Sequence, residues 1–215
     1  MSPVTAERER NLDALHEEID RCLLCREKGL AIGKLVGTER GRVGAPVMTI
    51  GIGPGAAVMR TGKAFAGNSF ARLRSWFEEA GFPSSAAALR GALYQTSLNK
   101  CVAVPDAELC RARLWRNCSG FLWRQIDIVQ PRLVLVLGAE AVVSLFQRPF
   151  GAVVGECRST AHLYENDLFP STLVEAQWLA LPHPSGLSRS MNNAGVRRRV
   201  IQALQAELTS IVFQF

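Results

Sequence analysis

Apolar residues along this chain follow two different periods. Four short runs have the length and the apolar composition of buried strands: residues 46–51, 93–98, 132–137 and 178–181. Around them, apolar residues recur every three to four positions, as on one face of a helix, over residues 5–25, 68–81, 106–128, 139–146 and 194–211. Residues 147–176 follow neither period and stay unassigned. Strands that alternate with helices predict a three-layer α/β/α sandwich around a central, mainly parallel, four-stranded sheet.

The chain length and composition suit one globular domain that spans residues 1–215. No linker, repeat or low-complexity segment divides the chain, and 48% of its residues are hydrophobic and 20% charged. No apolar run reaches the ~18 residues of a membrane helix, and the polar N-terminus is not a signal peptide. We therefore expect a cytoplasmic protein with no membrane partner, and a monomer, because nothing indicates a dimer interface. The net charge of +6 suits an anionic partner, although an incidentally basic enzyme has the same charge.

Three loops follow predicted strands at the edge of the sheet where ligands of such folds bind. The first, residues 51–67, is rich in glycine, so its backbone can approach a ligand closely. It matches neither a Walker loop nor the GxGxxG pattern, and an ordinary tight turn would have the same composition. Phe65 in this loop lies outside any helical stripe. It either fills the core or offers a stacking surface for a base.

The other two loops carry polar side chains at the ends of strands. Ser97 and Asn99 follow the second predicted strand, and an amide can offer both a donor and an acceptor to the edge of a base. The alternative is that Asn99 only forms a turn. His183 comes directly after the last strand, between two prolines that restrict its direction. Leu187 is an apolar residue in a polar loop, the placement expected of a wedge that replaces a flipped base in a duplex.

The chain has six cysteines, and their spacing favours thiols or metal ligands over disulfides. Cys22 and Cys25 form a CxxC motif, and four more follow: Cys101, Cys110, Cys118 and Cys157. Without a secretion signal, a disulfide scaffold is not expected. Buried, unreactive thiols and metal ligands are the remaining interpretations.

Taken in order, these motifs resemble those of the uracil-DNA glycosylase superfamily, most closely its iron–sulfur families 4 and 5. Five elements along nearly the whole chain carry the resemblance: Cys22-Leu-Leu-Cys25, Gly51-Ile-Gly-Pro-Gly55 with Thr61-Gly-Lys-Ala-Phe65-Ala-Gly67, the segment from Tyr94 to Cys101, the segment from Cys118 through Pro131 to Gly138, and His183-Pro-Ser-Gly-Leu187. Each motif alone has little specificity. Their shared order and spacing make the resemblance specific.

The resemblance implies a 4Fe–4S cluster that ties the N-terminal helix to the core. Its four ligands would be Cys22, Cys25, Cys101 and Cys118. Cys110 lies two helical turns before Cys118 and competes with it, although the residues after Cys118 match the family better. Cys157 is then a spare thiol. Zinc also accepts four thiolates, and the sequence does not distinguish it from a cluster.

The implied activity is flipping of uracil out of single- or double-stranded DNA and hydrolysis of its N-glycosidic bond. His183 would stabilise the departing base, Phe65 would stack on it, and the base-binding set would be completed by Gly51, Ile52, Gly53 and either Ser97 or Asn99. Contacts to DNA would come from Pro54, Gly55, Ser185, Gly186, the wedge Leu187 and Arg189. On the weaker ground of proximity, Arg60, Lys63 and Lys100 are further candidates for contacts with the phosphates.

The chain departs from the family in two places. No acidic residue lies between Gly51 and Gly67. The best-known members carry a water-orienting Asp where this chain has Gly53, and family 4 carries a Glu where it has Ile52. The family's base-reading Asn aligns with Ser97, whereas Asn99 lies two positions later. The missing acid motivates an alternative, a non-catalytic or covalent-type binder of uracil or damaged DNA. A metal-bearing protein for another nucleotide-like ligand is a second alternative.

Overall fold

The computed structural model describes residues 2–34, 41–54, 58, 61, 68–82, 85–103, 108–163, 174–186 and 188–212. The helices are α1 (Pro3–Arg21), α2 (Leu24–Glu27), α4 (Asn68–Glu79), α5 (Ala86–Ala92), α6 (Glu108–Val129), α7 (Ala139–Phe146), α8 (Phe150–Val153) and α9 (Ala194–Val212), with 3-10 turns η1 (Thr160–Leu163) and η2 (Ser190–Asn192). The strands are β1 (Ala31–Lys34), β2 (Val47–Gly51), β3 (Leu93–Ser97), β4 (Cys101–Ala103), β5 (Leu133–Leu137), β6 (Cys157–Ser159) and β7 (Gln177–Leu181). Within these ranges, no helix is both long enough and apolar enough to cross a membrane.

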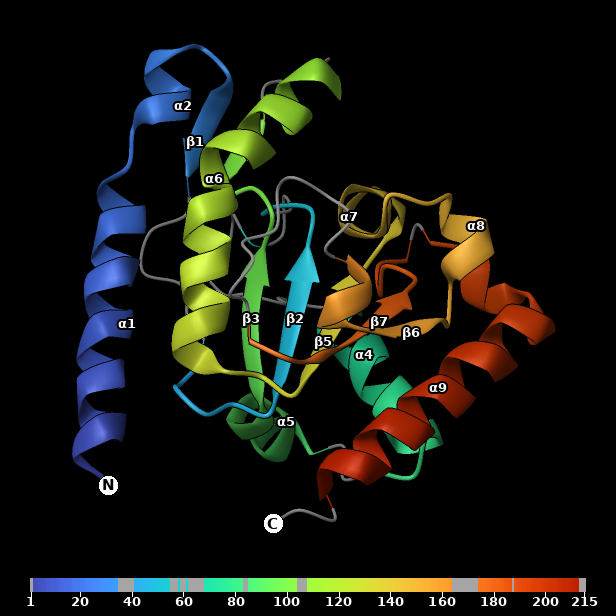
Figure 1. The fold of residues 1–215 in the computed structure, drawn as a ribbon. Coiled ribbons are helices and arrows are strands. Elements are labelled where there is room, and N and C mark those ends of the chain that lie inside the picture. Colours follow the sequence, from blue (N-terminus) through green and yellow to red (C-terminus); the bar gives the residue numbers. More distant parts are fainter. Residues whose placement is uncertain are drawn as a thin grey trace.

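The central sheet contains the four strands expected from the sequence, and they are parallel. The strand order is β3-β2-β5-β7-β6, with β2 paired in parallel to β3 and β5, and β5 to β7 (Figure 1). The predicted α/β class is therefore confirmed. The sheet has a fifth strand, β6, which pairs antiparallel with the edge of β7. It comes from the segment that showed no clear period, because three residues are too few to establish one.

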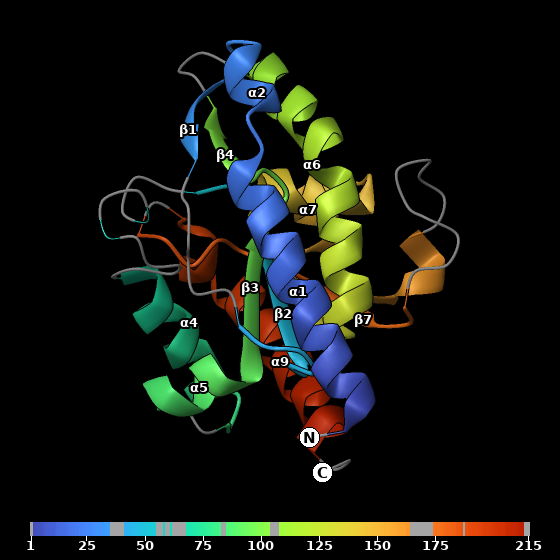
Figure 2. The ribbon, with the colours of Figure 1, turned by 90° about the vertical axis from the view of Figure 1, so that its left-hand side faces the viewer.

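Helices cover both faces of the sheet (Figures 1 and 2). Side chains alternate along each strand, so β5 directs Val134 and Val136 to one face and Leu133, Leu135 and Leu137 to the other. The first face packs on α6 and α7, with α1 lying against α6, and the second packs on α4, α5 and α9. This three-layer arrangement brings the carboxyl ends of β2, β3, β5 and β7 to one edge of the sheet.

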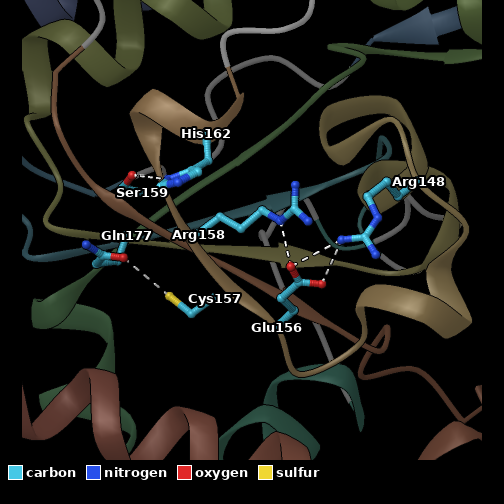
Figure 3. Close-up of polar contacts among 7 residues, drawn as sticks. All are labelled: Arg148, Glu156, Cys157, Arg158, Ser159, His162 and Gln177. Atoms are coloured by element: carbon cyan, nitrogen blue, oxygen red, sulfur yellow. Dashed lines mark hydrogen bonds and ion pairs between the residues drawn. The ribbon is translucent and has the colours of Figure 1, made fainter.

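The added strand β6 carries a cluster of polar contacts (Figure 3). Glu156, just before β6, accepts hydrogen bonds from Arg158 at 2.7 Å and from Arg148 at 3.1 Å. Charged side chains at a sheet edge discourage pairing with another chain. Cys157 donates to Gln177 at 3.6 Å, and burial, followed by the nearby Glu207, raises the pKa of its thiol to about 12. A pKa raised in this way favours the protonated thiol at pH 7, which is the less reactive form, and the role of Cys157 as a spare cysteine stays a prediction.

The N-terminal helix is shorter than the pattern predicted. The sequence predicted one helix over residues 5–25, whereas α1 ends at Arg21 and α2 begins at Leu24. Cys22 caps α1 in an extended conformation, so the chain turns between the two cysteines of the CxxC motif. The strands β1 and β4 pair antiparallel beside α2 and the first half of α6 (Figure 2). This second, two-stranded sheet gave no recognisable pattern because its strands are only three and four residues long.

Candidate active site

The first two loops are joined by backbone hydrogen bonds at the carboxyl edge of the sheet. The amide of Leu98 donates to the carbonyl of Gly51 at 2.8 Å, and that of Asn99 to the carbonyl of Ile52 at 2.9 Å. A Cβ atom at Gly53 would lie 3.5 Å from the Cβ atom of Asn99, an ordinary van der Waals distance. The structure therefore brings together Gly51, Ile52, Gly53 and Asn99, as the sequence predicted for the base-binding loops.

Ser97 and Asn99 differ in what their side chains do. The Ser97 hydroxyl donates to the backbone carbonyl of Asn99 at 2.8 Å and so closes the turn after β3. Asn99 is only 3% exposed, and its Oδ1 atom accepts no hydrogen bond from any residue that the structure describes. An unpaired buried amide oxygen is unfavourable by roughly 1–3 kcal/mol. Asn99 is therefore the side chain with unused capacity to bind a ligand, and Ser97 is the one that shapes the turn.

His183 follows β7 and is held by its own loop. The backbone amide of Ser185 donates to His183 Nδ1 at 3.1 Å. Burial lowers the pKa of His183 below its ordinary value, so the ring is neutral at pH 7. A neutral imidazole that accepts at Nδ1 carries its proton on Nε2. The ring therefore presents an N–H donor on the side away from Ser185.

Gly138 gives His183 its place beside a helix terminus. This glycine lies between β5 and α7 with φ of 94°, and its amide donates to the carbonyl of Leu181 at 2.9 Å. A Cβ atom at Gly138 would lie 3.1 Å from the Cβ atom of His183, so a side chain would crowd the ring. The helix α7 begins directly after Gly138. Its N-terminus therefore places partial positive charge next to His183.

Lys100 was a candidate for a phosphate contact, but its ammonium group is turned inward. Lys100 is 9% exposed, and its Nζ atom donates to Thr96 Oγ1, to the Ser97 carbonyl and to Gln125 Oε1, each at 2.7 Å. Gln125 in turn donates to the Tyr94 hydroxyl at 2.9 Å. The ammonium group of Lys100 therefore stabilises, from the protein interior, the turn that carries Ser97 and Asn99.

Four cysteines proposed as ligands come from elements that meet at the N-terminal end of α6. Cys25, Cys101 and Cys118 are buried, and Cys22 is half-buried. Cys25 and Cys101 belong to one small apolar cluster, and Asn117 donates to Cys25 Sγ at 3.3 Å. Cys118 is close enough to Cys25 and Cys22 for their charges to raise its pKa, although burial contributes most. Among the described side chains, no three form a ready-made set of metal ligands.

Several predicted site residues lie outside the described residues: Gly55, Arg60, Lys63, Phe65 and Leu187. Of those that are described, Gly186 and Arg189 are exposed, and Pro54 and Ser185 are half-buried. The side chain of Cys110 is likewise not described. The roles expected for all these residues stay predictions.

One contact at this edge was not foreseen. Arg72 on α4 donates from Nη1 to the backbone carbonyl of Ser185 at 2.8 Å. The two residues are 113 positions apart, and nothing in the local sequence marks an exposed helical arginine as a partner for a loop carbonyl.

The fold is thus a parallel α/β/α sandwich, with a histidine and an amide side chain at the carboxyl ends of its strands. The model of the Uracil DNA glycosylase superfamily matches residues 38–205, and the chain belongs to this superfamily. It is also similar to the Type-4 uracil-DNA glycosylase of Thermotoga maritima, with 26% identity over 204 residues, which cover 92% of this chain and 93% of that protein. The resemblance inferred from the motifs is thus confirmed. The matched family range includes Cys101 and Cys118 and begins after Cys25.

Proposed function

We propose that this protein is a uracil-DNA glycosylase that uses His183 to stabilise the departing base. The observation that carries the proposal is the hydrogen bond from the Ser185 amide to His183 Nδ1. It fixes the proton of a neutral ring on Nε2, so the ring can donate to an oxygen that gains negative charge. Membership of the superfamily and the similarity to a Type-4 enzyme support uracil in DNA as the substrate.

The reaction breaks the bond between C1′ of the sugar and N1 of uracil. The bonding electrons leave with the base, whose negative charge spreads onto O2, and the sugar becomes oxocarbenium-like. His183 Nε2–H then hydrogen-bonds O2 more strongly than in the ground state, and the N-terminus of α7 adds partial positive charge nearby. A donor placed in this way contributes about 3 kcal/mol to catalysis.

The base is read by Asn99 in this proposal. Its unpaired Oδ1 accepts from uracil N3–H, and its Nδ2 donates to O4, a pairing that cytosine does not offer in its ordinary form. Binding uracil thus satisfies an oxygen that is unsatisfied without a ligand. Backbone groups of Ile52 and Gly53 lie beside this amide and complete the pocket, and Phe65 would stack on the base.

Water completes the reaction without a carboxylate from the first loop, since residues 51–67 contain none. The water oxygen forms a bond to C1′, one proton passes to solvent, and the uracil anion later takes a proton from solvent. We assign the orientation of this water to backbone carbonyls of the first loop and to Asn68, which begins α4 at the exposed surface.

Contacts with DNA would come from residues around the two outer loops. Pro54, Gly55, Ser185 and Gly186 would hold the phosphates beside the flipped nucleotide, with Arg189 supplying charge and Leu187 filling the gap in the base stack.

Cys22, Cys25, Cys101 and Cys118 would hold a 4Fe–4S cluster. The donor chemistry suits this group, because a 4Fe–4S cluster is held by four thiolates. Cys25 and Cys101 share one apolar cluster, and Cys118 lies close enough to Cys22 and Cys25 for their charges to affect it, although the described side chains do not form a ready-made ligand set. The cluster would supply a structural link between the elements that carry these cysteines. Visible absorbance together with iron analysis distinguishes the cluster from zinc. Zinc in place of iron would overturn the assignment of the cluster, although zinc could still link the same elements.

The test of the function is excision from oligonucleotides that contain one uracil. Single- and double-stranded substrates are incubated with excess enzyme and treated with alkali, which cleaves at abasic sites. We expect strand cleavage at the uracil and release of free uracil. Tight, uracil-dependent binding without abasic sites would instead support the non-catalytic binder. A protein–DNA adduct that survives denaturation would support the covalent-type binder.

A further inference from the structure

The helix α4 reaches from the first loop to the loop that carries His183. It begins at Asn68, directly after the first loop, and its exposed residue Arg72 donates to the Ser185 carbonyl at 2.8 Å. The same carbonyl accepts a longer bond, 3.3 Å, from the Ser188 amide within the loop. Of the two bonds that described residues donate to this carbonyl, the one from Arg72 is therefore the shorter.

Ser185 links Arg72 to His183 through its two flanking peptide groups. The carbonyl that follows its Cα atom is held by Arg72, and the amide that precedes it donates to His183 Nδ1 at 3.1 Å. Fixing one peptide group limits rotation about the Ser185 backbone and so limits the direction of the other. The contact with Arg72 therefore helps to fix the hydrogen bond from the Ser185 amide to His183 Nδ1, which selects the tautomer of His183.

The helix that presents Arg72 is firmly anchored. Its opposite face buries Phe70, Leu73, Trp76 and Phe77 against the sheet and α9. Its last residue, Glu79, also receives two hydrogen bonds from Arg197 of α9, at 2.9 Å from Nε and 2.5 Å from Nη2. Paired bonds of this type fix geometry well. Arg72 therefore contacts the loop from a rigid support.

We propose that Arg72 is a positioning residue that acts through Ser185 to keep His183 in the Nε2–H tautomer. The proposal rests on the proposed function, since its consequence for rate requires His183 to stabilise the leaving base. The competing role for an exposed arginine at this edge is a phosphate contact. The two roles predict different kinetics, because positioning affects the chemical step and a phosphate contact affects DNA affinity and its dependence on salt.

The kinetic test compares Arg72→Met and Arg72→Lys with Arg42→Met. Arg42 is a matched control: it is exposed, and its Nε atom donates to the Gly91 carbonyl at 3.3 Å, on the opposite edge of the sheet. We expect Arg72→Met to lower the single-turnover rate of uracil release about 10- to 100-fold with little change in DNA affinity. Arg72→Lys, which keeps one donor and the charge, should recover part of this loss, and Arg42→Met should match the wild type.

Nitrogen NMR of the His183 ring tests the same proposal without substrate. We expect the wild type to show the Nε2–H tautomer, Arg72→Met a mixture of both tautomers, and Arg42→Met the wild-type spectrum. If Arg72→Met keeps the wild-type tautomer, or loses affinity and salt dependence with an unchanged chemical step, the positioning role is wrong. If the wild type releases no uracil, the proposed function fails, while the NMR result still decides the role of Arg72.

Discussion

His183 and Asn99 both follow parallel strands of one sheet at its carboxyl edge, yet their polar atoms differ in whether they have a hydrogen-bond partner. His183 Nδ1 is satisfied by the Ser185 amide, whereas Asn99 Oδ1 is buried without a partner among the described residues. A group that must hold one protonation state needs its second atom occupied in advance. A group that must recognise a ligand keeps an atom open for it. In the proposed function, this contrast distinguishes His183, which would stabilise the leaving base, from Asn99, which would read it.

Replacing His183 should have the largest effect. In His183→Ala, the donor to O2 is lost, and we expect the single-turnover rate of uracil release to fall roughly 100- to 1000-fold. DNA affinity should change little, because the donor acts mainly as charge develops. The matched control is His162→Ala, which removes the exposed histidine of η1 that contacts Ser159 (Figure 3). Full activity in His183→Ala would mean that another group stabilises the leaving base.

Replacing the polar residues at and just after the end of β3, Ser97 and Asn99, should have the next largest effect. Asn99→Ala removes both contacts with the base, and we expect a loss of roughly 10- to 100-fold in kcat/KM for uracil. Ser97→Ala removes only the bond that closes the turn, and its effect should be smaller. A harmless Asn99→Ala beside a damaging Ser97→Ala would reverse the assignment of the base reader.

Adding a carboxylate beside Asn99 tests whether the first loop limits the rate. Gly53 has room for a Cβ atom, with the nearest atoms at 3.5 Å, and its φ lies outside the left-handed region. We expect Gly53→Asp to raise the single-turnover rate about 10-fold, because an Asp there can orient and deprotonate water. Gly53→Asn is the control without charge. Equal rates for Asp and Asn would show that water activation is not limiting.

The pH dependence should be the smallest effect. Burial lowers the pKa of His183, so the neutral ring persists as the pH falls through its ordinary value of about 6.5. The rate of uracil release should stay level through pH 6.5 and fall only below it, when the protonated Nδ1 can no longer accept from Ser185. The same shift contributes stability that is complete above the unfolded pKa and lost as the pH falls through the folded one. If the rate of uracil release already declines above pH 7 as the pH is lowered, a neutral, buried His183 would be contradicted.

The sequence was most informative where a periodic pattern or a motif marks a residue. The four parallel strands and the helices after them were predicted, because burial on both faces imposes apolar runs and helical stripes. The loop expected over residues 51–67 is described only in part, and Val58 and Thr61 within it are helical. The short strands β1, β4 and β6 were missed, since three or four residues show no period. The break at Cys22 and Leu23 was missed because the apolar stripe continues through it. The hydrogen bond between Arg72 and Ser185 joins a side chain to a backbone carbonyl. Every residue has such a carbonyl, so residue types do not indicate which one will be bound.

The most direct test of the central claim compares two leaving bases in the wild type and in His183→Ala. Fluorine at C5 withdraws electrons and makes the departing 5-fluorouracil anion more stable than that of uracil, so it needs less help from a hydrogen-bond donor. Single-turnover release is measured for both bases in the same oligonucleotide. If His183 stabilises the leaving base, the deficit of His183→Ala will be clearly smaller for 5-fluorouracil than for uracil. An equal deficit for the two bases would show that His183 acts on something other than the charge of the departing base.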